Sequence, residues 1–392
     1  MIAFQTILAE VKDGIKDLAH RPRNNVPSLD VLRSLAILLV FSGHFAAEFG
    51  APPLVQKFPL MYFGWTGVDL FFVLSGLLIG TQLWKELRRT GRIDIPVFLL
   101  RRGLRIWPLY FAFIVFLIAE GLFFGRDLSG IWSDLSFLSN YFHHQLSGGW
   151  SLSTEEQFYI AFPLLLFVAC RAMKMEQMWL LPVSALVLIP LARFATVQFS
   201  GMDAATVRDA MYSPIHTHSD GLAVGALLAW CTVVRARLLG SGSRLRIALP
   251  AAMIVLAGGL YVANRLLFNY TCLALVYGGL TALALGQKSA GGFVNWHGFY
   301  VLSRLSYGIY LNHFGLLPRV IPWLQALRGK GYVALTLGYL LALLACVAFA
   351  FLTFLFIEWP FLRVRERWLE SVGHHKPAVA LHAGGSEAAG KR

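Results

Sequence analysis

Apolar residues occur along this chain in runs of about twenty, and each run is long enough to cross a lipid bilayer as a helix. The runs expected to be membrane spans are 31–49, 64–84, 104–124, 154–172, 177–198, 214–234, 245–263, 269–286, 298–317 and 332–357. The pattern therefore predicts an all-α polytopic integral membrane protein with about ten transmembrane helices.

Basic residues between the runs predict the orientation of the chain. They crowd before the first span, in the second and sixth connections and after the last span, whereas most of the alternate connections carry few. Because cytoplasmic loops of membrane proteins are enriched in Lys and Arg, both termini are expected in the cytoplasm. One connection disagrees, since Arg319, Arg328 and Lys330 fall on the side expected to be outside. We expect a cytoplasmic amphipathic segment at 1–27, a transmembrane domain at 28–368 and a disordered cytoplasmic tail at 369–392.

Composition agrees with this class. The chain is 57% hydrophobic and 14% charged, whereas a soluble protein carries about 25% charged residues. The formal net charge of +13 fits basic loops that face the cytoplasm better than nucleic-acid binding, and no nucleic-acid partner is expected. The four cysteines lie in apolar runs without metal-ligand spacing, so no metal site is expected.

Ionisable residues inside membrane spans are costly and by default indicate a functional site. On the expected cytoplasmic side, Arg33 lies near the start of the first span, Arg102 and Arg105 lie at the entrance of the third, and Glu358 ends the tenth. Guanidinium groups match phosphate oxygens, so the three arginines are candidates for binding a polyanionic cytosolic ligand. The alternative for such residues is an anchoring role in the positive-inside topology.

Toward the expected outer side lies a second group of ionisable residues, namely His44, Asp69, Glu155, Glu156, His216, His218, Asp220 and His313. A neutral imidazole is a natural general base for a hydroxyl near neutral pH. His44 follows Arg33 by eleven residues, which places it on nearly the same helix face and about 16 Å further along the axis. We expect a carboxylate, Asp69 or Glu155, to orient the His44 ring; a structural hydrogen bond is the alternative for each carboxylate.

Three local patterns have alternative interpretations. Ser153 with Glu156 three residues later resembles a capping box, which would explain Glu156 without catalysis. Ser75 lacks the Gly-x-Ser-x-Gly pattern of a nucleophile elbow, so a nucleophilic role is weakly supported. Gly76 and Gly80, four residues apart, are typical of close helix packing.

The longest outward connection, 125–153, is expected to form a lid or an acceptor surface. Candidate acceptor-binding residues on this side are Trp150, His216, His218 and Asp220.

Six segments taken together resemble the membrane-bound acyltransferase-3 family, the bacterial O-acylases of surface polysaccharides and related molecules. They are SLDVLR at 28–33 with GH at 43–44, GVDLFFVLSG at 67–76, RRGLRIWPLY at 101–110, WSLSTEEQFY at 150–159, LSYGIYLNH at 305–313 and FIEWPF at 356–361. The likeness covers about residues 28–366. Its departures are small: Trp65-Thr66-Gly67 stands where a Gly-Gly pair is common, and Thr154 where Val is common.

The resemblance implies a ten-helix domain in the bacterial cytoplasmic membrane, an acyl-coenzyme A donor and a hydroxyl acceptor on a carbohydrate or lipid-linked glycan. It implies that Arg33 and His44 are essential and that Arg102, Arg105, Glu155 and Glu156 participate. The expected reaction is O-acylation, most simply O-acetylation from acetyl-CoA as co-substrate with no bound cofactor. We expect His44 to act as base or as acyl carrier, and Tyr307 or His313 to stabilise the oxyanion. A proton-coupled transporter or flippase that uses the same buried groups is the alternative.

Overall fold

The computed structural model describes residues 2–22, 25–125, 127–236, 238, 243–286, 291–327 and 331–371, and these residues form helices joined by turns and loops. The elements are α1 (Ile2–Ala19), α2 (Pro27–Phe49), α3 (Pro53–Gln56), α4 (Pro59–Tyr62), η1 (Gly64–Thr66), α5 (Gly67–Thr90), α6 (Ile95–Phe124), α7 (Ile131–Leu135), α8 (Gly149–Ala169), η2 (Met175–Gln177), α9 (Leu180–Phe199), α10 (Ala204–Ala210), α11 (Asp220–Val233), α12 (Leu245–Ala263), α13 (Arg265–Gly286), η3 (Gly292–Asn295), α14 (His297–Leu324), η4 (Gln325–Leu327), α15 (Tyr332–Thr353), the π-helical turn η5 (Phe354–Glu358) and α16 (Trp359–Ser371).

Seven helical segments within the described residues are long and apolar enough to cross a membrane. They are Pro27–Phe49, Gly64–Thr90, Ile95–Phe124, Met175–Phe199, Leu245–Ala263, Arg265–Gly286 and Tyr332–Ser371. The prediction of an all-α protein with several membrane-spanning helices is therefore confirmed. The number ten and the cytoplasmic placement of the termini stay predictions.

Each of the ten expected runs coincides with a helix, but several helices begin or end elsewhere than expected. α6 begins nine residues before the expected third span because Asp94 caps it, accepting a hydrogen bond from the Val97 amide at 3.1 Å. α11 has only 14 residues, shorter than a usual span. α16 extends to Ser371, and the rest of the expected tail lies outside the described residues.

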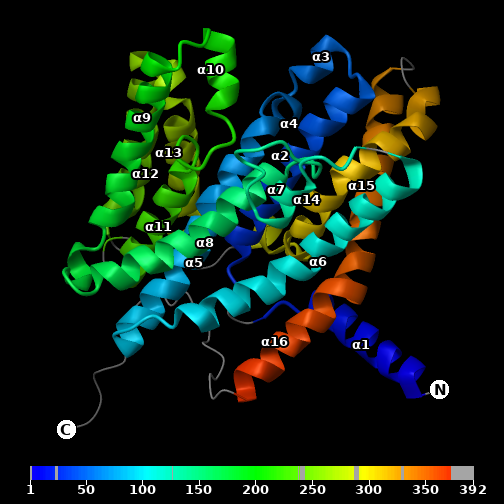
Figure 1. The fold of residues 1–392 in the computed structure, drawn as a ribbon, viewed down its shortest axis with the longest axis horizontal. Helices are drawn as coiled ribbons and strands as arrows, with labels where there is room; N and C mark the ends of the chain where they lie inside the picture. The colour runs from blue at the N-terminus through cyan, green and yellow to red at the C-terminus, as the bar shows by residue number, and fades with distance from the viewer. Residues whose placement is uncertain are drawn as a thin grey trace.

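α5 and α11 pack closely against each other along their lengths (Figure 1). A Cβ atom on Gly76 would lie 2.2 Å from the carbonyl oxygen of Leu222, and a Cβ on Gly225 would lie 2.2 Å from that of Val73. Only hydrogen fits at these positions, so the two backbones approach each other directly. This confirms the prediction that Gly76 lies in a close helix contact.

α2 packs against α14 and α5, and α14 packs against α15, which together form one side of the bundle (Figure 1). α12 and α13 pack against each other on the other side, beside α9 and α11. α6 and α8 run obliquely across the front of this bundle. The candidate site lies behind these two oblique helices.

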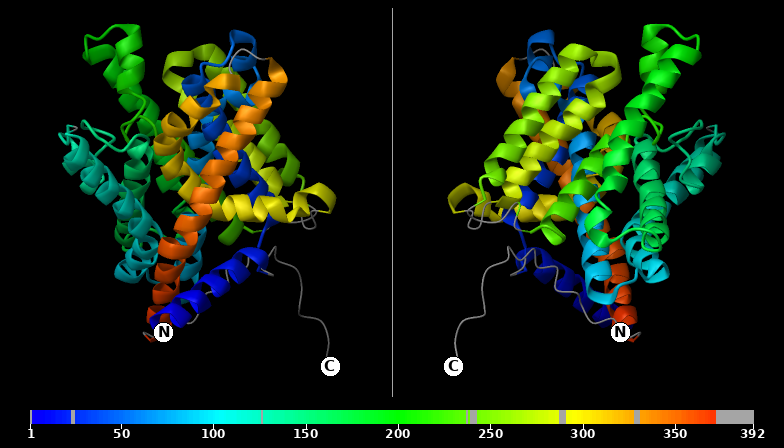
Figure 2. Two further views of the ribbon diagram at one scale, coloured as in Figure 1. Left: turned by 90° about the vertical axis from the view of Figure 1, so that its right-hand side faces the viewer. Right: turned by 90° about the vertical axis from the view of Figure 1, so that its left-hand side faces the viewer.

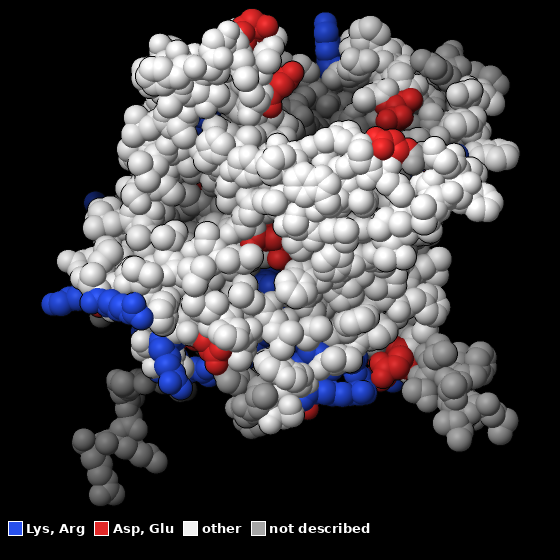
Figure 3. Space-filling model, in the orientation of Figure 1, with Lys and Arg blue, Asp and Glu red and all other residues white. Residues whose placement is uncertain are grey.

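α1 and α16 lie together at one end of the molecule (Figure 2). Arg363 and Arg367 of α16 donate hydrogen bonds to Asp13 and Glu10 of α1, at 3.3 and 3.4 Å. Lys and Arg side chains gather at this end, whereas the broad face above it is mostly uncharged, with one small acidic and basic spot near its middle (Figure 3). The described parts of both terminal segments therefore share the basic end of the protein.

Candidate active site

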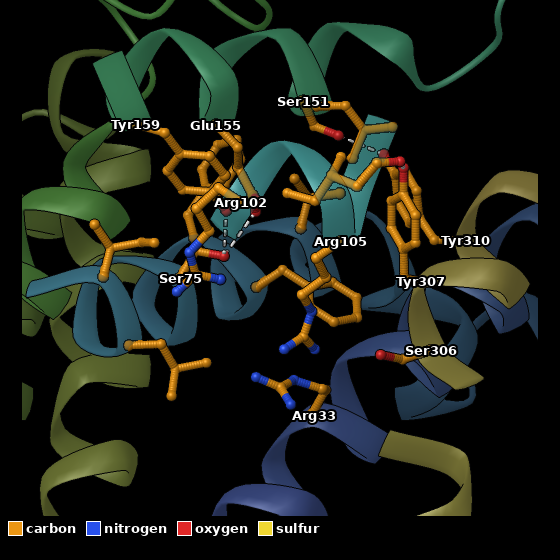
Figure 4. A pocket seen from close by; sticks show the side chains of 17 residues that line it. Arg33, Ser75, Arg102, Arg105, Ser151, Glu155, Tyr159, Ser306, Tyr307 and Tyr310 are labelled. Atoms are coloured by element: carbon orange, nitrogen blue, oxygen red, sulfur yellow. Dashed lines mark hydrogen bonds between the residues drawn. The ribbon is translucent and has the colours of Figure 1, made fainter. Parts of the chain in front are cut away.

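A cavity of about 110 Å³ lies where α2, α5, α6, α8 and α14 converge (Figure 4). Its polar lining residues are Arg33, Ser75, Arg102, Arg105, Ser151, Glu155, Tyr159, Ser306, Tyr307 and Tyr310. Five of the residues singled out from the sequence thus meet here: Arg33, Arg102, Arg105, Glu155 and Tyr307. They come from four helices that are far apart in the chain.

The cavity contains three arginines with few compensating partners. Arg33 donates one long hydrogen bond to Ser303 at 3.4 Å, and Arg102 lies over the ring of Tyr159 at 5.7 Å. Within the described residues, neither Arg102 nor Arg105 makes a hydrogen bond or an ion pair. In Figure 4 the guanidinium groups of Arg33 and Arg105 point toward each other across the cavity. Buried cations that repel each other are costly unless an anion joins them, so the geometry fits an anionic ligand.

Glu155 lies at the other wall of the cavity and is held by two hydroxyl groups. Ser75 donates a hydrogen bond to Oε1 at 2.9 Å, and Tyr159 donates one to Oε2. Tyr159 follows Glu155 by one helical turn, so this contact is local, whereas Ser75 comes from α5. Sequence reasoning missed Tyr159 and set Ser75 aside. The four-residue spacing between Glu155 and Tyr159 was the available signal.

His44 does not line the cavity and contacts His313 instead. Its Nδ1 lies 2.9 Å from the Val40 carbonyl oxygen and 3.3 Å from Nε2 of His313. A carbonyl only accepts hydrogen bonds, so Nδ1 of His44 carries the proton and Nε2 carries the lone pair. Nδ1 of His313 likewise lies 3.1 Å from the Ile309 carbonyl, which leaves its Nε2 free to accept from His44. Nε2 of His44 makes no hydrogen bond within the described part of the chain.

Tyr310 links the His44–His313 pair to the cavity, and Phe314 packs on both histidines. The ring of Tyr310, which lines the cavity, lies 5.7 Å from that of His313. The ring of Phe314 lies 4.0 Å from His313 and 4.5 Å from His44. The hydroxyl of Tyr310 is fixed by Ser151 at 2.6 Å. The cavity and the histidine pair are thus neighbours, with the ring of Tyr310 in contact with both.

Neither Asp69 nor Glu155 contacts His44, so the prediction that one of them orients its ring is wrong. Asp69 pairs with His218, whose Nε2 lies 2.9 Å from Oδ1, and both side chains are buried. Glu155 is bound to Ser75 and Tyr159 as described above. The partner of His44 is His313.

The prediction that Trp150, His216, His218 and Asp220 form an acceptor-binding surface is also corrected. The ring of Trp150 stacks on that of His218 inside the protein, with centroids 5.6 Å apart. Asp220 is fully buried and forms a bidentate pair with Arg193, at 2.8 and 3.0 Å. These three residues therefore offer no surface to an acceptor, and only His216 is exposed. Arg193 was missed, although an arginine within an apolar run was a signal for a buried ion pair.

Glu156 is not a capping residue. α8 begins at Gly149, so Ser153 lies inside the helix, where its hydroxyl bonds that of Ser139 at 2.6 Å. Oε2 of Glu156 accepts a hydrogen bond from Trp107 Nε1 at 3.2 Å, and its buried Oε1 has no partner within the described residues. The hydroxyl of Tyr307 donates to the Ile106 carbonyl at 2.9 Å, so it is not free to donate to an oxyanion in this conformation.

The connection 125–153 is organised by Asp134, for which sequence reasoning gave no role. Its Oδ2 accepts hydrogen bonds from the amides of Gln145 and Leu146, at 2.8 and 3.1 Å. Burial raises the pKa of Asp134 above its ordinary value, and these two hydrogen bonds partly oppose the shift. The carboxyl group thereby holds this loop against the first turn of α8, beside Gly149.

A family model described as an acyltransferase domain, of acyltransferase family 3, matches residues 26–355. The chain is 26% identical to the peptidoglycan O-acetyltransferase OatA of Listeria monocytogenes, over 88% of this chain and 57% of that protein. It is 28% identical to the putative peptidoglycan O-acetyltransferase YrhL of Bacillus subtilis, over 76% of this chain and 49% of that protein. The chain thus spans about half the length of these two relatives. No solved structure gives a significant match.

Proposed function

Because this chain belongs to the acyltransferase-3 family, we propose that it is a membrane O-acetyltransferase that uses cytoplasmic acetyl-CoA and acetylates a carbohydrate hydroxyl. The names of its relatives favour a cell-wall glycan as the acceptor and the bacterial cytoplasmic membrane as the location. The observation that carries the proposal is that one continuous helix, α2, brings Arg33 into the arginine-lined cavity and His44 against His313.

The donor would enter from the basic end of the molecule. Its phosphates would meet Arg33, Arg102 and Arg105, whose forked donors suit phosphate oxygens. Its pantetheine arm would lie in the cavity and carry the thioester toward Tyr310, beside the histidine pair. The rise along α2 from Arg33 to His44 is about 16 Å, so the two ends of the donor would sit at two ends of one helix.

The acceptor hydroxyl would give its proton to Nε2 of His44, the ring nitrogen with the free lone pair. The oxygen would attack the thioester carbonyl, and the C–S bond would break as the ester C–O bond is completed. The CoA thiolate would then take the proton back from Nε2, which restores the neutral ring.

His313 would support this cycle without touching the substrate. When Nε2 of His44 is protonated, the ring becomes an imidazolium with two N–H donors. The Val40 carbonyl and Nε2 of His313 both face Nδ1 of His44, so both would accept from the charged ring and stabilise it. This is the role that a carboxylate plays in serine hydrolases, filled here by two neutral acceptors.

The proposal is tested with the full chain in lipid vesicles, given acetyl-CoA and peptidoglycan glycan fragments. We expect acetyl-CoA-dependent release of free CoA with acetylation of the glycan, both abolished by His44→Ala. His20→Ala, which removes an exposed histidine, serves as the matched control and should retain wild-type rates.

Full transfer by His44→Ala would refute the assignment of the base. Absence of any thioester consumption by the wild-type protein with these acceptors would contradict the proposed reaction and favour the transporter alternative.

A further inference from the structure

The arginine cluster continues beyond the cavity toward the basic end of the protein. Arg105 lies within electrostatic range of Arg33 and Arg102, and also of Arg304 on α14 and Arg365 on α16. Arg365 is in turn within range of Arg101, Arg102 and Arg304, and the carboxylate within its range is that of the adjacent Glu366. Arg304 and Arg365 do not line the cavity, but α16, which carries Arg365, packs against α6, which carries Arg102 and Arg105.

These two outer arginines differ in how they are compensated. Arg304 forms an ion pair with Asp17 of α1 at 2.5 Å. Arg365 makes no ion pair or hydrogen bond within the described residues, although it is only partly exposed. The neighbouring basic residues of α16, Arg363 and Arg367, are both paired with carboxylates of α1. Among the basic residues of α16, Arg365 is therefore the one whose N–H donors are available to a ligand.

Helix geometry explains why Arg365 faces the cluster. Glu358, in the π-helical turn η5, is buried within electrostatic range of Arg105 and Arg304. Arg365 follows Glu358 by seven residues, about two helical turns, so it lies on nearly the same face. Arg367 follows by nine residues and lies about 180° away, on the face that meets α1.

Holding guanidinium groups that repel each other close together costs free energy, so we expect a bound anion to offset the repulsion. Glu358 attracts Arg105 and Arg304 electrostatically, but within the described residues it forms no ion pair or hydrogen bond with either, and its buried Oε1 has no partner. A ligand with several phosphate groups that extends from the cavity to α16 can accept hydrogen bonds from the arginines of the cavity and from Arg365 together.

We propose that Arg365 is a phosphate-binding residue for the nucleotide end of the donor, so that the C-terminal helix α16 forms part of the donor site. This inference rests on the proposed function, because it takes CoA as the polyanion. The phosphates nearest the pantetheine arm meet Arg33, Arg102 and Arg105 in the cavity, and the nucleotide beyond them extends toward Arg365 on α16, which packs against α6. Arg367, on the opposite face of the same helix, takes no part.

The test measures CoA binding to the full-length protein in lipid nanodiscs by calorimetric titration. Arg365→Gln should raise the Kd for CoA about tenfold, the lower end expected for loss of one charge-assisted contact. Arg365→Lys should keep much of the affinity, and Arg367→Gln should leave it unchanged. Salt screens a partly exposed contact with phosphate. The ratio of the Kd of Arg365→Gln to that of the wild type should therefore be smaller at about 500 mM KCl than at about 50 mM KCl.

The inference is overturned if wild type and Arg365→Gln bind CoA equally well. It is also overturned if Arg367→Gln weakens binding as much, or if the ratio of the Kd of Arg365→Gln to that of the wild type is the same at both salt concentrations, since those results indicate a structural effect. Failure of the wild-type protein to bind CoA at all would instead refute the proposed function.

Discussion

Replacement of Gly76 by Ala tests the contact that positions one wall of the cavity. The new Cβ atom would lie 2.2 Å from the carbonyl oxygen of Leu222, whereas carbon and carbonyl oxygen normally approach to about 3.3 Å. The obstructing atom is backbone, so no side chain can turn away, and α5 and α11 must separate by about 1 Å. The hydroxyl of Ser75, one residue earlier, would move with α5 and lose its 2.9 Å contact with Glu155.

The expected cost is about 3 kcal/mol, at the upper end for overpacking of a tight interior because neither helix can relax locally. With an unfolding entropy of about 2.1 cal/mol/K per residue, this lowers the unfolding midpoint by about 4 °C for a chain of this size. The buried thiols of Cys272 and Cys346 provide the assay in a background where the half-buried Cys170 and Cys231 are replaced by serine, because a thiol-reactive fluorescent dye labels the buried pair only on unfolding.

Gly258→Ala is the matched control. Gly258 lies in α12, and a Cβ atom there would meet no atom within 4 Å. Alanine is a better helix former than glycine by about 1 kcal/mol, so the midpoint should stay or rise slightly. Equal midpoints for Gly76→Ala and wild type, or equal losses for both variants, would refute the argument that α5 and α11 meet backbone to backbone.

Three further variants test buried polar contacts, each followed by the same dye assay. Tyr159→Phe removes a donor to the Glu155 carboxylate and should cost about 1.5–3 kcal/mol; an unchanged midpoint would show that the hydroxyl does not hold the carboxylate. Arg193→Met leaves Asp220 buried without its cation and should cost about 3–5 kcal/mol, most of which Arg193→Met with Asp220→Leu should restore; no recovery would contradict the pairing. Because burial raises the pKa of Asp134, the folded protein binds this proton more tightly than the unfolded chain, and stability falls as pH rises from about 4 toward that raised pKa. Asp134→Asn should reduce the change of the unfolding midpoint with pH over this range. An unchanged slope of midpoint against pH would refute the role given to Asp134.

The helices could be predicted from the sequence because the apolar runs that form them are local. Their ends could not, because ends depend on caps and on what each helix packs against. α6 shows this: the apolar run begins near residue 104, but the helix begins at Ile95, and its polar first turns carry Arg102 and Arg105 into the cavity. A hydropathy window treats those arginines as the boundary of the span, whereas the fold uses them inside the protein.

The partners of the ionisable residues were beyond the reach of sequence reasoning because they are long-range contacts. Asp69 and His218 are separated by 149 positions, and Ser75 and Glu155 by 80. Spacing rules operate within a helix and predict only which residues share a face, as they did for Arg33 and His44 on α2. The four carboxylates and four histidines that the sequence placed in one group allow many pairings, and tertiary packing selects one.

A comparison of His218 with His44 shows how tertiary contacts determine which histidine ring can act as a base. His218 has no free ring nitrogen, because Nδ1 lies 2.6 Å from the Tyr212 carbonyl and Nε2 lies 2.9 Å from Asp69. A ring with both nitrogens engaged and no exposure cannot take a proton from a substrate, and it serves instead to fix its segment to α5. His44 has the same side chain in a similar apolar setting, but its hydrogen bonds all use Nδ1 and leave Nε2 with a lone pair. The difference between a structural histidine and a candidate base therefore lies in which ring nitrogens are engaged, and the acceptors that engage them come from the tertiary fold.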